Sequence, residues 1–124
     1  MRKVSSIAAA VTLTVGCTGV AVTSVATPAS ASCSHAHSNI DTAGGRLFNG
    51  SNINIRTGPH TSCPSLGYGQ STHEVDFWCY AGGDRVTANG YTTYSWTYLK
   101  DLTTGVSGWV ADALLKNLGS NIAC

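Results

Sequence analysis

The sequence predicts a small all-β domain that folds as a barrel or a sandwich. Five short segments have the residue pattern of strands, turn residues separate them about every 8–15 residues, and no segment has a convincing helical period. Short strands joined by tight turns are typical of small barrels and sandwiches. The chain has 124 residues, which suits a single domain.

The first part of the chain, residues 1–31, is predicted to be a secretory signal peptide. A basic start, Met1–Lys3, precedes an uncharged stretch rich in Ala, Val and Thr, and Ala29–Ala31 has the small-residue pattern of a cleavage site. Two alternatives stay open. The apolar stretch is long enough for a membrane anchor, and Cys17 follows a small residue as a lipid-modified cysteine does. We expect cleavage and a secreted protein with no membrane partner.

Cleavage after Ala31 leaves a nearly neutral chain. Arg2 and Lys3 are lost, so five of the seven basic residues remain against six acidic residues, and the net charge is −1. Such a chain lacks the basic surface of a nucleic-acid-binding protein. It also lacks the basic run that holds a protein on an anionic membrane. We therefore expect no nucleic-acid partner.

Four cysteines remain after cleavage: Cys33, Cys63, Cys79 and Cys124. An even number in a short exported chain predicts two disulfides, which supply stability that a small core lacks. Spacing alone leaves all the pairings open. A zinc site is not favoured, because the chain has no C-x-x-C pair.

Residues 32–46 are predicted to form an irregular arm, because they are small and polar and have no apolar period. Arg46–Phe48 follows as a candidate short strand, and Asn49-Gly50 is a turn pair that closes it.

The clearest strand is Ile53–Arg56. Its two isoleucines share one face, and Asn54 and Arg56 share the other. Gly58-Pro59 ends it, because proline has no amide hydrogen to donate to a neighbouring strand. The next segment, Gly58 to Gly69, is rich in glycine and proline and is predicted to be a loop.

Val75–Tyr80 alternates between two faces and is predicted to be a strand. The side chains expected to face inward are Val75, Phe77 and Cys79. Trp78 and Tyr80 are then expected to face outward. Ala81–Asp84 is a predicted turn, and residues 85–93 are expected to form a long hairpin loop around Asn89-Gly90.

The last elements follow in quick succession. Ser95–Lys100 is β-branched and aromatic and is predicted to be a strand, and Asp101–Gly105 turns the chain. Ser107–Ala111 is the next predicted strand. Asp112–Leu115 is expected to form one helical turn, and residues 117–124 a C-terminal tail.

Three blocks of this chain resemble bacterial SH3-like (SH3b) domains. Ile53–Pro59 resembles the opening L-N-V-R-S-G-P signature of that family, and Trp96–Leu99 resembles its W-x-x-V/L strand. Gly108–Val110, followed by Leu114-Leu115, resembles its closing G-W-V…Y-L element. The resemblance covers about residues 47–116 and implies a five-stranded, partly open β-barrel. It also implies a stand-alone exported binding module for bacterial cell-wall material or extended peptides, without catalytic residues.

The same resemblance implies a disulfide pairing. In such a barrel the loop with Cys63 would fold back over the strand with Cys79, so these two are expected to pair. The chain ends lie close together in SH3-like barrels, so Cys33 is expected to pair with Cys124.

Aromatic side chains are the main candidates for ligand binding. Trp78 and Tyr80 face outward by alternation, and Trp96 and Tyr98 do so if the residues between and after them face inward. Outward rings on adjacent strands form a shallow groove that stacks on sugars or flanks an extended peptide. The predicted ligand-binding residues are Asn54, Arg56, Trp78, Tyr80, Trp96 and Tyr98. Alternatively, the arm at residues 32–46 covers these rings.

Two other residue patterns bear on metal binding and on acid–base catalysis. His35 and His37 share one side of an extended arm and suit zinc or copper, but no third ligand is nearby, so we favour a solvated arm. Glu74 and Asp76 share a strand face, and we interpret them as two surface acids rather than an acid–base pair.

We expect no enzymatic activity, because no G-x-S-x-G elbow is present and the predicted disulfides leave no free thiol in the processed chain. We also expect no cofactor and no metal. The predicted protein is a monomer whose partner is peptidoglycan or an extracellular peptide. A second hypothesis is a secreted inhibitor or accessory subunit that docks on another exported protein.

Overall fold

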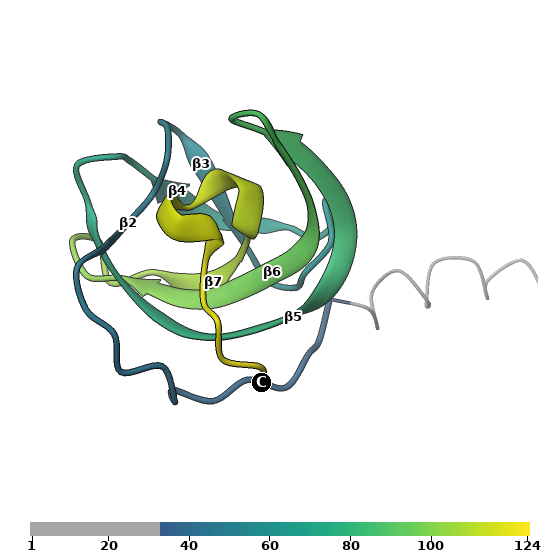
Figure 1. Cartoon of the computed structure of the whole chain (residues 1–124), viewed down its shortest axis with the longest axis horizontal. Helices are drawn as coiled ribbons and strands as arrows, with labels where there is room; N and C mark the ends of the chain where they lie inside the picture. The colour runs from purple at the N-terminus through teal and green to yellow at the C-terminus, as the bar shows by residue number, and fades with distance from the viewer. Residues whose placement is uncertain (1–32) are drawn as a thin grey trace, which may run out of the picture.

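The structure, a computed structural model, describes residues 33–124. The predicted signal peptide and Cys17 lie outside these residues. The described chain is all-β. Six antiparallel strands form one sheet in the order β2-β5-β6-β7-β3-β4, which curls into a partly open barrel (Figure 1). The predicted fold class is confirmed, with six strands rather than five. Within the described part, no helix has the length and apolar character needed to span a membrane.

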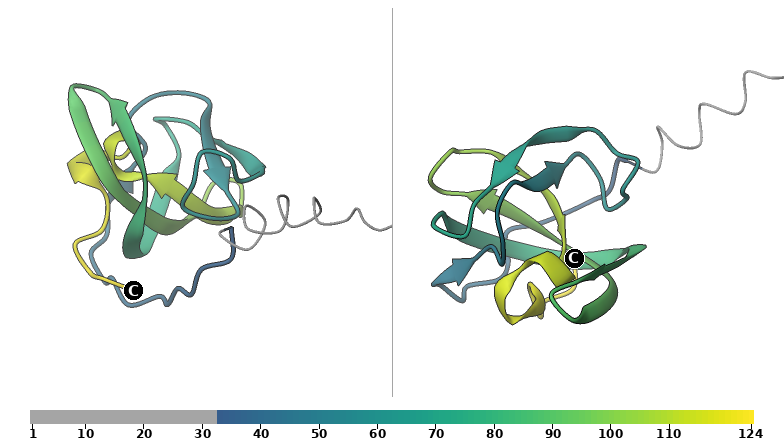
Figure 2. Two further views of the ribbon diagram at one scale, coloured as in Figure 1. Left: turned by 90° about the vertical axis from the view of Figure 1, so that its right-hand side faces the viewer. Right: turned by 90° about the horizontal axis from the view of Figure 1, so that it is seen from above.

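The strands are β2 Arg46–Leu47, β3 Ile53–Arg56, β4 Ser65–Gly69, β5 Glu74–Ala88, β6 Tyr91–Asp101 and β7 Ser107–Ala111. Two short 3₁₀ helices follow, η3 Asp112–Leu114 and η4 Lys116–Leu118. All five predicted strands and the predicted helical turn are present. The two 3₁₀ helices lie in the hollow of the curled sheet (Figure 1), and Figure 2 gives two further views of the fold.

Strand β4 corrects the prediction of an uninterrupted loop from Gly58 to Gly69. It pairs antiparallel with β3. Its glycines look like loop residues, but Gly69 is buried and a Cβ there would collide with the ring of Phe48. The strand needs glycine at this position so that its backbone can approach the core.

The hairpin of β5 and β6 contains a β-bulge that changes which side chains share a face. Phe77 lies opposite Leu99, but the next pair is Cys79 with Tyr98, so β5 has one extra residue there. Opposite residues on antiparallel strands share a face. Cys79 therefore shares a face with Tyr98 and not with Phe77, which corrects the simple alternation.

The main core lies inside the curled sheet. Its buried side chains are Phe48, Ile53, Ile55, Val75, Phe77, Leu99, Val110 and Leu115. The inward orientation predicted for Val75, Phe77 and the two isoleucines of β3 is confirmed by their burial. Six of these residues come from strands β3, β5, β6 and β7, and Phe48 and Leu115 pair in an isolated β-bridge, so the core joins most of the barrel.

A second apolar cluster lies on the other face of β6 and β7 and contains Trp96, Trp109 and Ala111. Trp96 is only 2% exposed, and its indole nitrogen donates a hydrogen bond to the Asp84 carbonyl at 2.9 Å. The prediction that Trp96 faces solvent is therefore wrong. Trp96 does lie on the predicted side of β6, but other chain segments cover that side.

Asp84 fixes one of these covering segments, the loop at residues 57–63. Its carboxylate accepts hydrogen bonds from His60 Nδ1 at 2.8 Å and from the Thr61 amide at 2.9 Å. Its own amide donates to the Pro59 carbonyl at 3.2 Å. The His60 bond, more than the Thr61 amide bond, lowers the pKa of Asp84 below 3.8. The loop is thus tied to β5 beside Trp96.

The two disulfides are Cys33–Cys63 and Cys79–Cys124, with Cα–Cα distances of 5.6 and 4.9 Å. Two bridges were predicted and are confirmed, but the pairing implied by the SH3b resemblance is wrong. The β-bulge supplies the physical reason. It puts Cys79 on the face away from the main core, where the C-terminal tail passes.

The N-terminal arm and the C-terminal tail both run along the outer edge of β5 (Figure 1). The Asp41 amide donates to the Trp78 carbonyl at 2.9 Å. Further along, Tyr80 accepts from the Cys124 amide at 2.9 Å and donates to the Ile122 carbonyl at 2.8 Å. These bonds satisfy backbone groups at a sheet edge that would otherwise be unpaired.

A buried chain of hydrogen bonds links arm, tail and sheet. Ser120 Oγ donates to Asp41 at 2.6 Å, and the Ser120 amide donates to Thr97 Oγ1 at 2.9 Å. The hydroxyls of Thr97 and Ser95 donate to the Asp112 carboxylate at 2.6 and 2.5 Å. Burial raises the pKa of Asp112 from 3.8 to about 6, although the Ser95 and Thr97 bonds act in the opposite direction.

We expect Asp112→Asn to change how stability depends on pH. The folded protein binds the Asp112 proton more tightly than the unfolded chain, so this contribution is full below pH 3.8 and is lost as pH rises through about 6. The pKa difference corresponds to about 3 kcal/mol. Urea unfolding across this window should show the wild-type free energy falling relative to that of the variant.

The pH range in which stability changes distinguishes the effect of Asp112 from that of Asp84. The lowered pKa of Asp84 adds stability above pH 3.8 that is lost only as pH falls through the lowered value, so it acts at more acidic pH. An Asp112→Asn variant with the same slope as wild type between about pH 4 and 6 would contradict the assignment.

Candidate functional site

The N-terminal arm covers the predicted aromatic groove. The rings of Trp78, Tyr98 and Trp109 adjoin one another, with centroids 5.0 Å apart for Trp78 and Tyr98 and 5.4 Å apart for Tyr98 and Trp109. His37 stacks on Tyr98 at 3.6 Å with an interplanar angle of 8°. His35 meets Trp109 edge-on at 5.3 Å. The alternative in which the arm covers these rings is therefore the observed arrangement.

The six predicted ligand-binding residues do not form one surface. Trp96 is buried, and Tyr80 lies opposite Thr97, on the face away from Trp78 and Tyr98. Arg56 uses its guanidinium to hold the Cys63 carbonyl at 3.0 Å.

The remaining predicted residues keep partly exposed positions. Asn54 is half-buried on β3, opposite Tyr68 of β4. Trp78 is half-buried and donates its indole hydrogen to Asp76 at 3.1 Å. The structure brings together only Trp78 and Tyr98 of the set, and those two lie under the arm.

The arm histidines have partners within the arm and on the sheet. His35 and His37 each place Nδ1 within hydrogen-bond distance of an arm carbonyl, at 2.9 and 3.1 Å. Across residues 33–124, no group of three or more His, Cys, Asp or Glu side chains is arranged to hold a metal ion. Stacking on Tyr98 and Trp109 is the role that the geometry assigns to these two rings.

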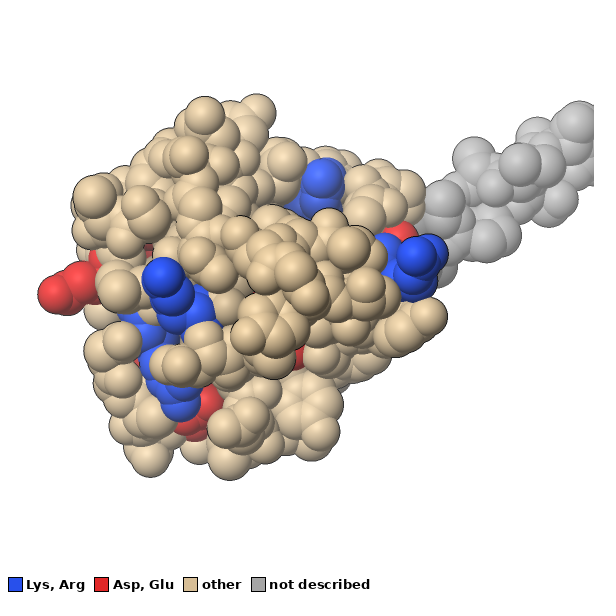
Figure 3. Space-filling model, turned by 45° about the horizontal axis from the view of Figure 1, so that its top comes forward, with Lys and Arg blue, Asp and Glu red and all other residues tan. Residues whose placement is uncertain are grey.

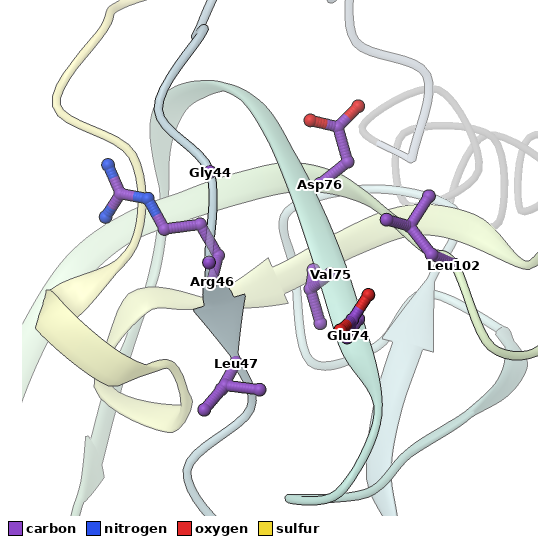
Figure 4. Close-up of a pocket in the computed structure, with 8 residues that line it drawn as sticks. Gly44, Arg46, Leu47, Glu74, Val75, Asp76 and Leu102 are labelled. Carbon is purple, nitrogen blue, oxygen red and sulfur yellow. The ribbon is translucent and has the colours of Figure 1, made fainter.

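An open hollow lies elsewhere, where β2 meets β5 at the edge of the sheet. We name it the β2–β5 hollow, and it has a volume of about 450 Å³. Its side-chain lining is Leu47, Val75 and Leu102, with Arg46, Glu74 and Asp76 as the charged residues. In Figure 4, Arg46 extends to one side of β2, and Asp76 and Leu102 lie across β5 on the other.

The charges around the β2–β5 hollow have both signs. The Arg46 guanidinium lies over the Phe77 ring at 5.2 Å from its centroid, and its Nε is buried without a hydrogen-bond partner in the described chain. Asp76 accepts from Trp78, and Glu74 is exposed. In the register of β2 and β5, Arg46 lies opposite Val75 and Leu47 lies opposite Glu74, so the cation and the Glu74 carboxylate are on opposite faces of this strand pair.

A rigid turn holds Leu102 in place beside the hollow. Asp101 is fully buried, accepts hydrogen bonds from the amides of Thr103 and Thr104, and pairs with His73 Nδ1 at 2.6 Å. The Leu102 amide donates to the Glu74 carbonyl at 2.9 Å. Leu102 is 54% exposed although its backbone is fixed on both sides.

This arrangement can bind an apolar side chain between groups of opposite charge, and it has no nucleophile or metal ligand set among the lining residues. Sequence reasoning missed it because Leu47 and Leu102 are far apart along the chain. No local signal marked it, because a single exposed leucine in a turn is common in soluble proteins.

Comparisons with known proteins found no match: neither a protein-family model, nor a curated protein, nor a solved structure corresponds to this chain.

Proposed function

We propose that the protein is an exported, non-catalytic binding module for extended peptides, with the stem peptides of bacterial peptidoglycan as first candidate. The β2–β5 hollow carries this proposal. It combines an apolar floor, Leu47 and Leu102, with a cation and two carboxylates on opposite sides. A peptide presents the same elements, an apolar side chain between charged ends.

Three further features support the proposal. Two disulfides suit an oxidising compartment outside the cytosol. Most of the surface in Figure 3 belongs to uncharged residues, which suits neither nucleic acid nor an anionic membrane. The three blocks that resemble SH3b domains imply the same class of ligand.

Sedimentation with purified peptidoglycan tests this function. We expect the protein to pellet with intact peptidoglycan and to stay in solution when an amidase has removed the stem peptides. Leu102→Asp should weaken binding at least about tenfold, because burial of a leucine side chain contributes about 2 kcal/mol. Its exposure in the free protein means that the fold should tolerate the change.

Leu66→Asp is the matched control. Leu66 is 52% exposed, as Leu102 is, but lies on β4 at the opposite edge of the sheet. Equal losses in the two variants would place binding elsewhere than the β2–β5 hollow. Equal pelleting with intact and peptide-free glycan would contradict a peptide ligand.

A second candidate function is docking on another exported protein. The specific observation is that Leu66 and Tyr68 are both exposed on β4, which ends the sheet. An edge strand with apolar side chains suits pairing with a strand of a partner. A protein that never pellets with peptidoglycan, intact or not, would favour this candidate.

A further inference from the structure

A second hollow lies beside the 3₁₀ helices η3 and η4 and the start of β6. We name it the Lys116 pocket; it has a volume of about 400 Å³ and is lined by Asn49, Tyr91, Leu115, Lys116, Asn117 and Leu118. It shares no residue with the β2–β5 hollow.

The wall of this pocket is fixed by the tip of the β5–β6 hairpin. The Asn89 amide group donates to the carbonyls of Asn49 and Ala113 at 3.1 and 3.0 Å. The hairpin and the 3₁₀ helices lie beside each other in both views of Figure 2. These bonds join three segments that are distant in the sequence, so the pocket is a built feature of the fold.

Polar end groups converge on the Lys116 pocket without partners in the protein. The ammonium group of Lys116, the side-chain amides of Asn49 and Asn117 and the hydroxyl of Tyr91 form no hydrogen bond or ion pair with any residue from 33 to 124. Unpaired groups around one hollow are available to a ligand.

The backbone at the pocket is held in an unusual conformation. Asn117, Leu118 and Gly119 are three successive residues with positive φ, 59°, 56° and 76°. Leucine rarely adopts this left-handed region, because its Cβ crowds the backbone. Residues held in such conformations cluster at ligand clamps. The bend therefore coincides with the pocket and with two of its unpaired polar side chains.

We propose that the Lys116 pocket binds an acidic monosaccharide unit, a sugar ring that carries one carboxylate. Lys116 is the only charged lining residue, so it selects for one anionic group. The two asparagine amides and the Tyr91 hydroxyl donate and accept hydrogen bonds, as sugar hydroxyls require. Leu118, which is 37% exposed, offers an apolar contact for the carbon face of the ring. The volume suits a single small ligand.

Amide chemical shifts of the ¹⁵N-labelled protein test the proposal, with glucuronate, glucose and acetate as probes. We expect glucuronate to shift the amides of Tyr91 and residues 115–118. Glucose, which lacks the carboxylate, should bind at least about tenfold more weakly, and acetate, which lacks the ring, should leave these amides unchanged. Lys116→Gln should weaken glucuronate binding at least about tenfold.

Two variants keep the result decisive. Lys100→Gln removes an exposed lysine of β6 away from the pocket and should bind glucuronate as wild type does. Asn117→Gly suits the positive φ, so it should fold and yet bind more weakly because the amide is lost. Unchanged amides with glucuronate, an equal response to acetate, or full binding by Lys116→Gln would each overturn the proposal.

Discussion

Trp96→Ala should destabilise the protein by about 3–5 kcal/mol, the range measured when a buried aromatic side chain is truncated. The indole is 2% exposed and packs with Trp109 and Ala111. Its removal also leaves the Asp84 carbonyl without its donor. Small domains have total stabilities of about 5–15 kcal/mol, so the melting temperature should fall steeply.

The matched control for this change is Tyr94→Ala on the same strand. Tyr94 is 63% exposed, and its truncation should alter the unfolding free energy by less than about 0.5 kcal/mol. The sequence-based assignment of Trp96 to a solvent-facing groove implied the reverse, because an exposed ring can be truncated with little loss of stability. A Trp96→Ala protein as stable as the Tyr94→Ala protein would restore that earlier view and contradict the buried position.

Replacing Cys79 and Cys124 together by alanine should cost about 4 kcal/mol. The bridge closes a sequence separation of 45 residues, and the chain-entropy model gives that value for a loop of this size. The change also releases the tail from the edge of β5. Urea unfolding of the oxidised double variant against wild type measures the loss, and we expect the variant to be near the limit of folding.

Peptide mapping of the unreduced protein checks the connectivity directly. Cleavage by trypsin and by a protease specific for glutamate separates Cys63 from Cys79, because Glu74 lies between them. The peptide with Cys33 should be joined to the peptide with Cys63. A bridge between the peptides of Cys33 and Cys79 or Cys124 would contradict the structure.

Much of the fold followed from local patterns. Strands β3, β5, β6 and β7 have alternating or β-branched sequences, and a turn at Asn89-Gly90 joins β5 to β6. The predicted turn at Ala81–Asp84 and the long loop at residues 85–93 were wrong, because β5 continues to Ala88 and β6 begins at Tyr91. Strand β4 was missed because the glycines that let it approach Phe48 are also the residues typical of loops.

Non-local contacts account for the other errors. The extra residue at Cys79 changes the face of the following residues, and alternation counted from the sequence cannot detect a bulge. The disulfide pairing implied by the SH3b resemblance was wrong, because Cys79 is joined to the C-terminal tail and not to Cys63. Trp96 was assigned to the correct side of its strand, but the loop that covers it is fixed by the distant contact between Asp84 and His60.

The candidate site was predictable only in part. The alternative in which residues 32–46 cover the aromatic rings was open from the sequence, and the contacts of His35 and His37 confirm it. The β2–β5 hollow was not predictable, because Leu47 and Leu102 line one hollow only through the pairing of β2 with β5 and the turn fixed by Asp101. The strand pairing and the turn both depend on contacts between segments that are distant in the sequence.

The bonds that arm and tail make with β5 have a consequence for the behaviour of the protein at high concentration. A strand of 15 residues with a bare edge is a template for stacking molecules into fibrils. Here two segments from opposite ends of the chain occupy the carbonyl of Trp78 and both backbone groups of Tyr80. Self-association through this part of the β5 edge is thereby blocked, and the strands at the two ends of the sheet are short, with two residues in β2 and five in β4.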